Sequence, residues 1–360
     1  MSPPPSLATA FASKRVRLIL LFVALSVILL AFTAYSPLSL PESATGLFAS
    51  APPSNDTSEP EPVHEEPGTA TDWSRFAYGQ YVTNSLYLCN SVMFFAMLQK
   101  LNSKADRIMM YPSTMLPNPE APTSQKEDGR LLIKARDKYN VKLSPITISH
   151  KEGSDPTWED SFTKLLVFNQ TQYDRVLSLD SDSTLLQHMD ELFLLPPATL
   201  AIPRAYWLFP QERVYSSQLI LVEPSKSEFA RIQRKIKSSG PNDYDMEIMN
   251  QLYGASALII PHRPYTMLTG ELREKDHAMY LGNPEETWDP VLAFNEAKFV
   301  HFSDYPVPKP WLPVSEQILK ENQPDCIASD DGSQDCSARD IWRGFYKDFK
   351  DRRQEVCKLR

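Results

Sequence analysis

Two aspartates one residue apart, Asp180 and Asp182, are the residues of this chain best suited to chemistry. A short β-prone run, residues 175–179, leads into them, and an acidic-apolar segment typical of a helical turn, residues 190–195, follows them. Ligands of open α/β sheets bind beyond the carboxyl ends of strands, so carboxylates placed there face a crevice. Mg²⁺ and Mn²⁺ take oxygen ligands from carboxylates and substrate phosphates together. The spacing therefore indicates a divalent metal that bridges the protein and a diphosphate.

A solvated turn is the simpler alternative, because Asp and Ser side chains often bond to nearby backbone in turns. The surroundings favour the metal, since a Val-Leu-Ser-Leu strand that ends in two acids and precedes Met-Asp-Glu-Leu-Phe is much rarer than Asp-x-Asp alone. In these residues the chain resembles glycosyltransferase family 8, the group that includes glycogenin. Over residues 161–195 it resembles the fungal, Golgi-resident N-acetylglucosaminyltransferase branch of that family.

The resemblance, which extends over about residues 73–311, implies one GT-A-like, Rossmann-like α/β domain with a mainly parallel sheet. It implies transfer of a sugar from a nucleotide-diphospho-sugar to a glycan or glycoprotein, with retention of configuration. The expected donor is UDP-N-acetylglucosamine and the expected cofactor is Mn²⁺. The alternatives are a UDP-glucose or UDP-galactose transferase of the same family and a non-catalytic, membrane-anchored sugar-binding protein.

Residues 81–87 end the first predicted strand and open the first long predicted helix. The family holds the nucleotide base and ribose at this strand end, and Thr83, Asn84 and Tyr87 match that pattern. Asn84 is equally suited to be the N-cap of the helix, because Asn side chains accept bonds from the first free N–H groups. The nucleotide and capping roles both stay open for this residue.

A second group of residues, 297–311, places His301 at the end of a strand and Lys309 in a Pro-rich loop. A lone His on a strand is usually a core residue. The resemblance implies instead that His301 completes the metal site with Asp180 and Asp182, and that Lys309 binds the diphosphate. Imidazole suits Mn²⁺ better than Mg²⁺, which prefers oxygen ligands. A carboxylate-pair glycoside hydrolase is disfavoured, since such enzymes need no diphosphate-binding lysine.

The resemblance assigns three further residues to the donor site. Lys164 aligns with a family lysine near the donor sugar and phosphates, and its apolar neighbours predict an ammonium group that emerges beside a packed face. Ser181 lies between the two metal aspartates and belongs to the donor site. Asp245 aligns with the family's catalytic aspartate, with a helix N-cap as the alternative. Met246 and Glu247 depart from the Gln and Gly that usually follow this aspartate, in the region of the sugar pocket.

An aromatic group after residue 205 has two possible roles. Tyr206, Trp207 and Phe209 are suited either to an acceptor-side sugar platform or to the core. The sequence leaves both roles open.

Alternating strand-like and helix-like runs must position these residues, and such alternation predicts a mainly parallel sheet flanked by helices. Strands are expected at residues 76–83, 107–111, 141–148, 175–179, 219–222 and 257–260, and helices at 85–101, 131–139, 161–168, 225–238, 245–253 and 340–360.

The N-terminus predicts a membrane anchor. Residues 1–17 form a short cytosolic tail with three basic residues, and residues 18–35 form an uncharged apolar run about long enough to cross a bilayer. The basic residues on one flank place residues 73–360 in the lumen, behind a Pro-rich, disordered stalk at residues 36–72. The expected location is the Golgi membrane, in type II topology. A cleaved signal peptide is the alternative.

Charge and cysteine content narrow the possible partners. The formal net charge is −8 and the chain has no basic stripe, which argues against a nucleic-acid partner. All four cysteines are lumenal on this topology, where disulfides persist, and Cys326 with Cys336 is the first choice for a pair. Four cysteines allow three full pairings, so the connectivity stays open. The absence of C-x-x-C spacing makes a cysteine metal cluster unexpected.

Overall fold

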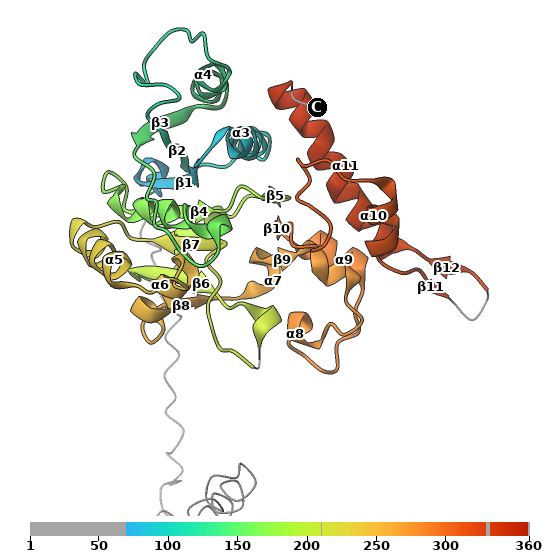
Figure 1. Cartoon of the computed structure of the whole chain (residues 1–360). Helices are drawn as coiled ribbons and strands as arrows, with labels where there is room; N and C mark the ends of the chain where they lie inside the picture. Colours follow the sequence, from blue (N-terminus) through green and yellow to red (C-terminus); the bar gives the residue numbers. More distant parts are fainter. Residues whose placement is uncertain (1–69, 210, 329–331, 359–360) are drawn as a thin grey trace, which may run out of the picture. The chain divides into compact units, whose positions relative to one another are not determined.

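A seven-stranded sheet in the order β3-β2-β1-β4-β7-β6-β8 forms the centre of the fold (Figure 1). The computed structural model describes residues 70–209, 211–328 and 332–358. The strands of this sheet are β1 (Phe76–Tyr81), β2 (Asp106–Pro112), β3 (Val141–Ile146), β4 (Arg175–Leu179), β6 (Leu200–Pro203), β7 (Leu219–Val222) and β8 (Leu258–Ile260). Strand β4 is buried along its whole length. A strand buried in this way has both faces of the sheet covered, which places it at the centre.

The sheet is mainly parallel, as the sequence predicts. Strands β3, β2, β1 and β4 pair in parallel, and β6 pairs in parallel with β8. Strand β7 runs antiparallel to both of its neighbours, β4 and β6. The predicted α/β fold is therefore confirmed, with β7 as the reversed strand.

Helices cover both faces of the sheet. Successive side chains of β4 point to opposite faces, and because they are apolar on both faces, each face needs a layer of helices to bury them. Leu177 and Leu179 belong to a core with α3 (Ser85–Lys100), α4 (Glu127–Tyr139) and α11 (Ser337–Cys357). Val176 belongs to a second core on the other face. That core packs against η3 (Ser161–Asn169), α5 (Lys226–Ser238) and α6 (Asp245–Tyr253).

A smaller sheet brings a distant segment to the end of β4. It contains β5 (Ser183–Leu185), β10 (Phe299–His301) and β9 (Met267–Leu268), in the order β5-β10-β9. Strand β10 runs antiparallel to β5, with His301 opposite Ser183. This register sets His301 beside the residue that follows Asp182.

The remaining elements are short. They are η1 (Trp73–Arg75), η2 (Pro156–Trp158), η4 (Asp190–Leu194), η5 (Tyr206–Leu208), α7 (His262–Tyr265), η6 (Thr269–Arg273), α8 (Ala278–Leu281), α9 (Pro290–Glu296), α10 (Glu316–Asn322), β11 (Ile327–Ala328) and β12 (Gln334–Asp335). Among the residues described, no helix has the length and apolar character needed to cross a membrane. The predicted tail and anchor, and the stalk up to residue 69, lie outside these residues.

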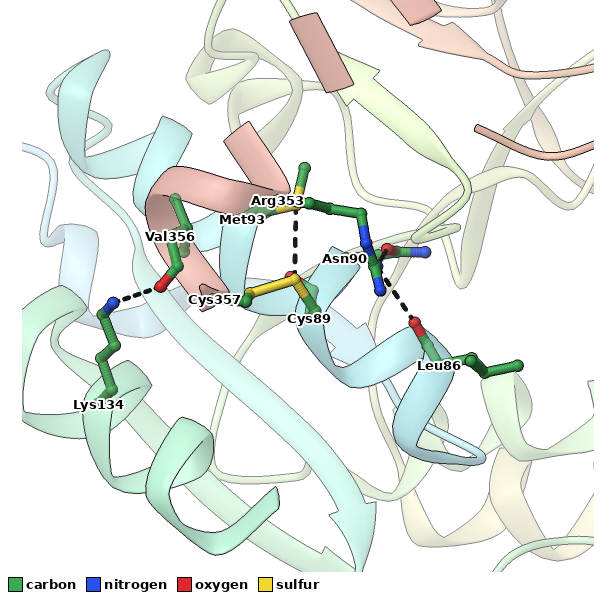
Figure 2. The surroundings of a disulfide bond; sticks show 8 residues. All are labelled: Leu86, Cys89, Asn90, Met93, Lys134, Arg353, Val356 and Cys357. Carbon is green, nitrogen blue, oxygen red and sulfur yellow. Dashed lines mark hydrogen bonds between the residues drawn. A yellow bond between two sulfur atoms is a disulfide. The ribbon is translucent and has the colours of Figure 1, made fainter. Parts of the chain in front are cut away.

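Two disulfides hold the C-terminal region. Cys326–Cys336 confirms the predicted pair, and Cys89–Cys357 joins α3 to the end of α11. Figure 2 shows Arg353 beside the second disulfide, where its guanidinium donates to Asn90 Oδ1 at 2.6 Å. Lys134 of α4 donates to the Val356 carbonyl. Helix α11 is thereby fixed to the two helices that cover one face of the sheet.

Candidate active site

Three potential metal ligands meet where β4 ends. One ligand atom each from Asp180, Asp182 and His301 lies within 4.8 Å of the others. Asp182 Oδ2 lies 3.2 Å from His301 Nε2. The structure thus brings together the three residues that the sequence assigned to the metal.

This donor set fits a divalent transition metal. Two carboxylates and an imidazole match the ligand preference of Mn²⁺ more closely than that of Mg²⁺. His301 Nδ1 is buried and has no hydrogen-bond partner within the described chain. Buried polar atoms are rarely left unpaired, and such an exception calls for an explanation such as an ion.

Lys164 bridges two carboxylates from different elements. Its Nζ lies 2.9 Å from Asp180 Oδ1 and 2.7 Å from Asp245 Oδ2, and it donates to the Ser217 carbonyl at 3.0 Å. The residue is only 3% exposed, so the ammonium is enclosed and does not emerge beside a packed face as the sequence predicts. Burial acts to lower the pKa of Lys164, but Asp180 and Asp245 outweigh it and raise this pKa above its usual value. Lys164 therefore stays charged inside the site.

Asp245 is held as a carboxylate by its neighbours. Burial acts to raise the pKa of Asp245, yet Lys164 and the hydroxyl of Ser217, 2.7 Å away, lower it overall. Tyr244 is the N-cap of α6, and Asp245 is the first residue within the helix. The capping alternative for Asp245 is thus incorrect, and its side chain is turned toward Lys164.

Lys309 supplies a second cation, which pairs with the other aspartate. Its Nζ lies 2.7 Å from Asp182 Oδ2 and also donates to the Phe302 carbonyl. Burial acts to raise the pKa of Asp182, but His301 and Lys309 hold it far below its usual value. Each metal aspartate is consequently paired with one lysine.

The charged form of Asp180 is less favoured by its surroundings than the charged form of Asp182. Burial is the largest influence on its pKa and raises it, Lys164 opposes this, and repulsion from Asp182 and Asp245 adds to the increase. The Tyr81 hydroxyl donates to Asp180 Oδ1 at 2.9 Å. A divalent cation would favour the charged form of both aspartates, since opposite charge within a few ångströms lowers a carboxyl pKa.

A cavity of about 420 Å³ opens over these residues. The predicted donor-site residues Thr83, Tyr87 and Ser181 line it, together with Lys164 and Asp245. Its further lining residues are Tyr81, Ser154, Asp155, Thr157, Trp158, Asp160, Ser161, Asp180, Asp182, Trp207, Ser216, Ser217, Gln218, Asn242, Tyr244, Met246, Glu247 and His301.

Asn84 does not line this cavity. Its side chain accepts a hydrogen bond from Leu86 N at 3.0 Å and caps α3. The structure therefore supports the capping role that the sequence left open and gives no donor contact for this residue.

The aromatic group after residue 205 divides between the two roles that the sequence left open. Tyr206 is 3% exposed and belongs to the core, whereas Trp207 lines the cavity. Trp158, which the sequence did not single out, also lines the cavity and is half exposed. Trp158 could have been found from the sequence, because it is a large aromatic residue in a short polar segment between two predicted elements.

A further carboxylate, Asp304, lies three residues after His301 and was not predicted. Its side chain is fully buried and accepts from Trp342 Nε1 at 2.9 Å, from the Tyr346 hydroxyl at 2.8 Å and from Thr269 Oγ1. Two of these donors come from α11, so the C-terminal helix holds the segment between His301 and Lys309.

Comparison with known proteins places the chain among fungal relatives. A protein named glucose N-acetyltransferase 1 from Gibberella zeae is 62% identical over 289 residues, which cover 79% of this chain and 63% of that protein. Its namesake from Aspergillus fumigatus is 44% identical over 313 residues, which cover 83% of this chain and 81% of that protein. The chain thus spans less than two thirds of the Gibberella relative's length.

Among solved structures, the apo bifunctional glycosyltransferase WbbM superimposes with a TM-score of 0.52 at 14% identity, over 81% of this chain and 52% of that chain. This likeness supports the fold alone. No family model matches the chain.

Proposed function

The chain belongs to the family of proteins named glucose N-acetyltransferase 1, within glycosyltransferase family 8, and from this premise we propose that it is a glycosyltransferase. The proposed reaction moves N-acetylglucosamine from UDP-N-acetylglucosamine to a glycan, with Mn²⁺ as cofactor and with retention of configuration. One observation carries the proposal: three metal ligands and Lys164 line a cavity at the end of β4, and Lys309 pairs with one of these ligands, Asp182.

The charges of the site suit a nucleotide diphosphate. Asp180, Asp182 and His301 would hold Mn²⁺, which when bound acts as a Lewis acid toward the leaving diphosphate. Lys309 contacts Asp182 and Lys164 contacts Asp180, so both ammonium groups can neutralise charge that develops on the phosphate oxygens. Thr83 and Tyr87 line the cavity at the end of β1, where a base and ribose would bind.

The proposed chemical step is a front-face displacement. An acceptor hydroxyl oxygen forms the new bond to the anomeric carbon as the bond from that carbon to the diphosphate oxygen breaks. The electron pair leaves with UDP, and the hydroxyl proton passes to the departing phosphate oxygen. Asp245, held ionised by Lys164, stabilises the oxocarbenium-like transition state and orients the sugar hydroxyls.

Met246 lines the cavity next to Asp245. Its thioether is only a weak hydrogen-bond acceptor, so assistance from an amide at this position is not available.

Three alternative functions use the same residues differently. A non-catalytic sugar-binding protein would need neither the paired lysines nor the three clustered metal ligands. The name of the relatives, taken literally, denotes acetyl transfer, and an acetyl donor gives no reason for three metal ligands between two lysines. A UDP-glucose or UDP-galactose transferase differs only in the sugar that fits beside Asp245 and Met246.

For the location we propose the Golgi membrane in type II topology. Lys14, Arg15 and Arg17 precede the apolar run of residues 18–35, which supports a cytosolic N-terminus. The two disulfides in the folded part support an oxidising compartment.

The test is donor turnover by the purified full-length chain. With Mn²⁺ and a panel of UDP-glucose, UDP-galactose and UDP-N-acetylglucosamine, we expect UDP release to be fastest from the last. Chelation of the metal with EDTA should stop it, and acetyl-CoA should not be consumed. Absence of UDP release from every donor would contradict the proposed activity, and a preference for UDP-glucose would correct the donor.

A further inference from the structure

One glycosylation motif lies within the described part of the chain. Asn169, Gln170 and Thr171 fit the pattern N-x-[ST] with a middle residue other than Pro. Such a motif is only a sequence pattern, so its use depends on where the fold places it. Whether the motif is glycosylated depends on the exposure of Asn169, on its distance from the active site and on the compartment in which the chain folds.

The motif lies on the surface. Asn169 is the last residue of η3 and Thr171 lies in the turn that follows, and both residues are exposed. The turn is closed by a hydrogen bond from Tyr173 N to the Gln170 carbonyl at 3.1 Å. Within the described chain the Asn169 side chain forms no hydrogen bond, so its amide is free to carry a bulky group.

The motif and the active site also lie at opposite ends of strand β4. It precedes the amino end of β4, whereas Asp180 and Asp182 follow the carboxyl end of the same strand. The five residues of β4 separate its two ends by about 16 Å, at the usual rise of a β-strand. A glycan on Asn169 would therefore leave the cavity open to donor and acceptor.

The disulfides indicate the compartment in which this modification occurs. All four cysteines are paired, in Cys89–Cys357 and Cys326–Cys336. Structural disulfides form in the lumen of the endoplasmic reticulum, where chains in the secretory pathway also meet the glycosylation machinery. This argument is independent of the transferase activity.

We propose that Asn169 is N-glycosylated, so that the folded domain carries a glycan on the face turned away from the active site. The co-substrate is a lipid-linked diphospho-oligosaccharide of the secretory host. The bond from its first sugar to the diphosphate breaks as a bond from that sugar to the Asn169 side-chain nitrogen forms, and the lipid diphosphate leaves together with one amide proton. Thr171 is the hydroxyl residue that the motif requires.

The test uses the full-length chain produced in a fungal secretory host. After treatment with endoglycosidase H, the peptide that contains Asn169 should carry one N-acetylglucosamine residue by mass spectrometry. Asn169→Gln and Thr171→Ala should each lose this mass completely, whereas Thr171→Ser should keep it. Thr171→Ala and Thr171→Ser change the same exposed side chain, so the pair separates loss of the motif from any effect on folding.

An unmodified Asn169 peptide in the wild-type chain would overturn the proposal. So would a glycan mass that persists on this peptide in Thr171→Ala. A second motif of the same pattern, Asn55, Asp56 and Thr57, precedes the described residues and serves as an internal reference. If Asn55 is modified and Asn169 is not, the chain has entered the lumen and the assignment of Asn169 is wrong.

Discussion

Two carboxylate centres follow two neighbouring strand ends, and they differ in what surrounds them. Asp180 and Asp182 after β4 line a cavity and are paired with Lys164 and Lys309. Asp304 after β10 has no exposed side-chain surface, accepts bonds from the buried side chains of Trp342 and Tyr346, and lies 3.6 Å from the Arg273 guanidinium. A carboxylate that faces a cavity beside two lysines can exchange these partners for a ligand. A buried carboxylate whose oxygens already accept hydrogen bonds from the protein stabilises the fold instead of binding a ligand.

The two centres are also connected. Asp304 lies between His301, a metal ligand, and Lys309, which pairs with Asp182. Trp342 and Tyr346 of α11 bind Asp304, so the C-terminal helix fixes the segment that joins His301, one of the three metal ligands, to Lys309. Substitutions at the first centre should remove chemistry and spare the fold, whereas substitutions at the second should weaken the fold first.

The largest effect is expected for Asp180→Asn. Removal of a metal carboxylate should lower turnover by at least about 10³-fold, in line with losses of electrostatic stabilisation at the reacting centre. Stability should not fall, because Asp180 is buried near the like charges of Asp182 and Asp245, and Lys164 keeps its bond to Asp245. Steady-state UDP release and thermal unfolding measure the two quantities.

Asp174→Asn is the matched control, because this exposed carboxylate precedes the same strand at its other end and, among the residues described, forms an ion pair with Arg75 alone. It should leave both quantities near the wild-type values. If Asp180→Asn retained wild-type turnover with Mn²⁺, the metal assignment would be wrong.

Asp245→Asn should lower turnover by about 10²- to 10³-fold, the usual cost of losing one electrostatic contribution to a transition state. Donor binding should change little, because the diphosphate contacts are made elsewhere. Met246→Ala, at the adjacent cavity-lining position, should have a much smaller effect. Turnover number and KM, determined separately for the three proteins, would show this difference. A covalent glycosyl ester on Asp245, seen by intact mass after mixing with donor alone, would contradict front-face attack.

Asp304→Ala should reduce the free energy of unfolding by about 2–5 kcal/mol, because it leaves buried donors without an acceptor. Asp304→Asn keeps one carbonyl oxygen as an acceptor and should cost less. Urea unfolding of the full chain measures both. If neither variant lowered the free energy of unfolding measurably, the bonds from Trp342 and Tyr346 would not hold the loop. The contrast between the two carboxylate centres would then be wrong.

The smallest effect is expected for Asn84→Ala. Loss of an N-cap typically costs about 1 kcal/mol of stability, and the KM for the donor should remain close to that of the wild type, because Asn84 does not line the cavity. Thr83→Ala, one residue earlier and within the cavity lining, should raise the donor KM instead. A large rise in KM for Asn84→Ala would restore the nucleotide role.

Predictions from sequence were most accurate where the pattern was local. Strand β4 and its aspartates were recognised because an all-apolar run that ends in two acids is contiguous in the chain. Strand β5 and strand β9, of three and two residues, were missed. Such short strands are defined by their pairing with β10 rather than by their own residues.

Side-chain environments were harder to predict than elements. Lys164 was expected at the edge of a packed face, but its enclosure depends on Asp245, which is far away in the sequence. Asp304 gave no signal, because a predicted helix at residues 340–360 does not by itself show that Trp342 and Tyr346 contact the loop after β10. Long-range contacts decide which carboxylate binds a ligand and which is saturated.

Binding of Mn²⁺ in the presence of UDP tests the central claim most directly, because it reports the metal site without requiring an acceptor. Titration followed by electron paramagnetic resonance should show one Mn²⁺ bound per wild-type chain, with tighter binding when UDP is added. Asp182→Asn should lose this UDP-dependent binding, since Asp182 is the carboxylate closest to His301. Equally tight binding of Mn²⁺ with UDP by Asp182→Asn would contradict the account.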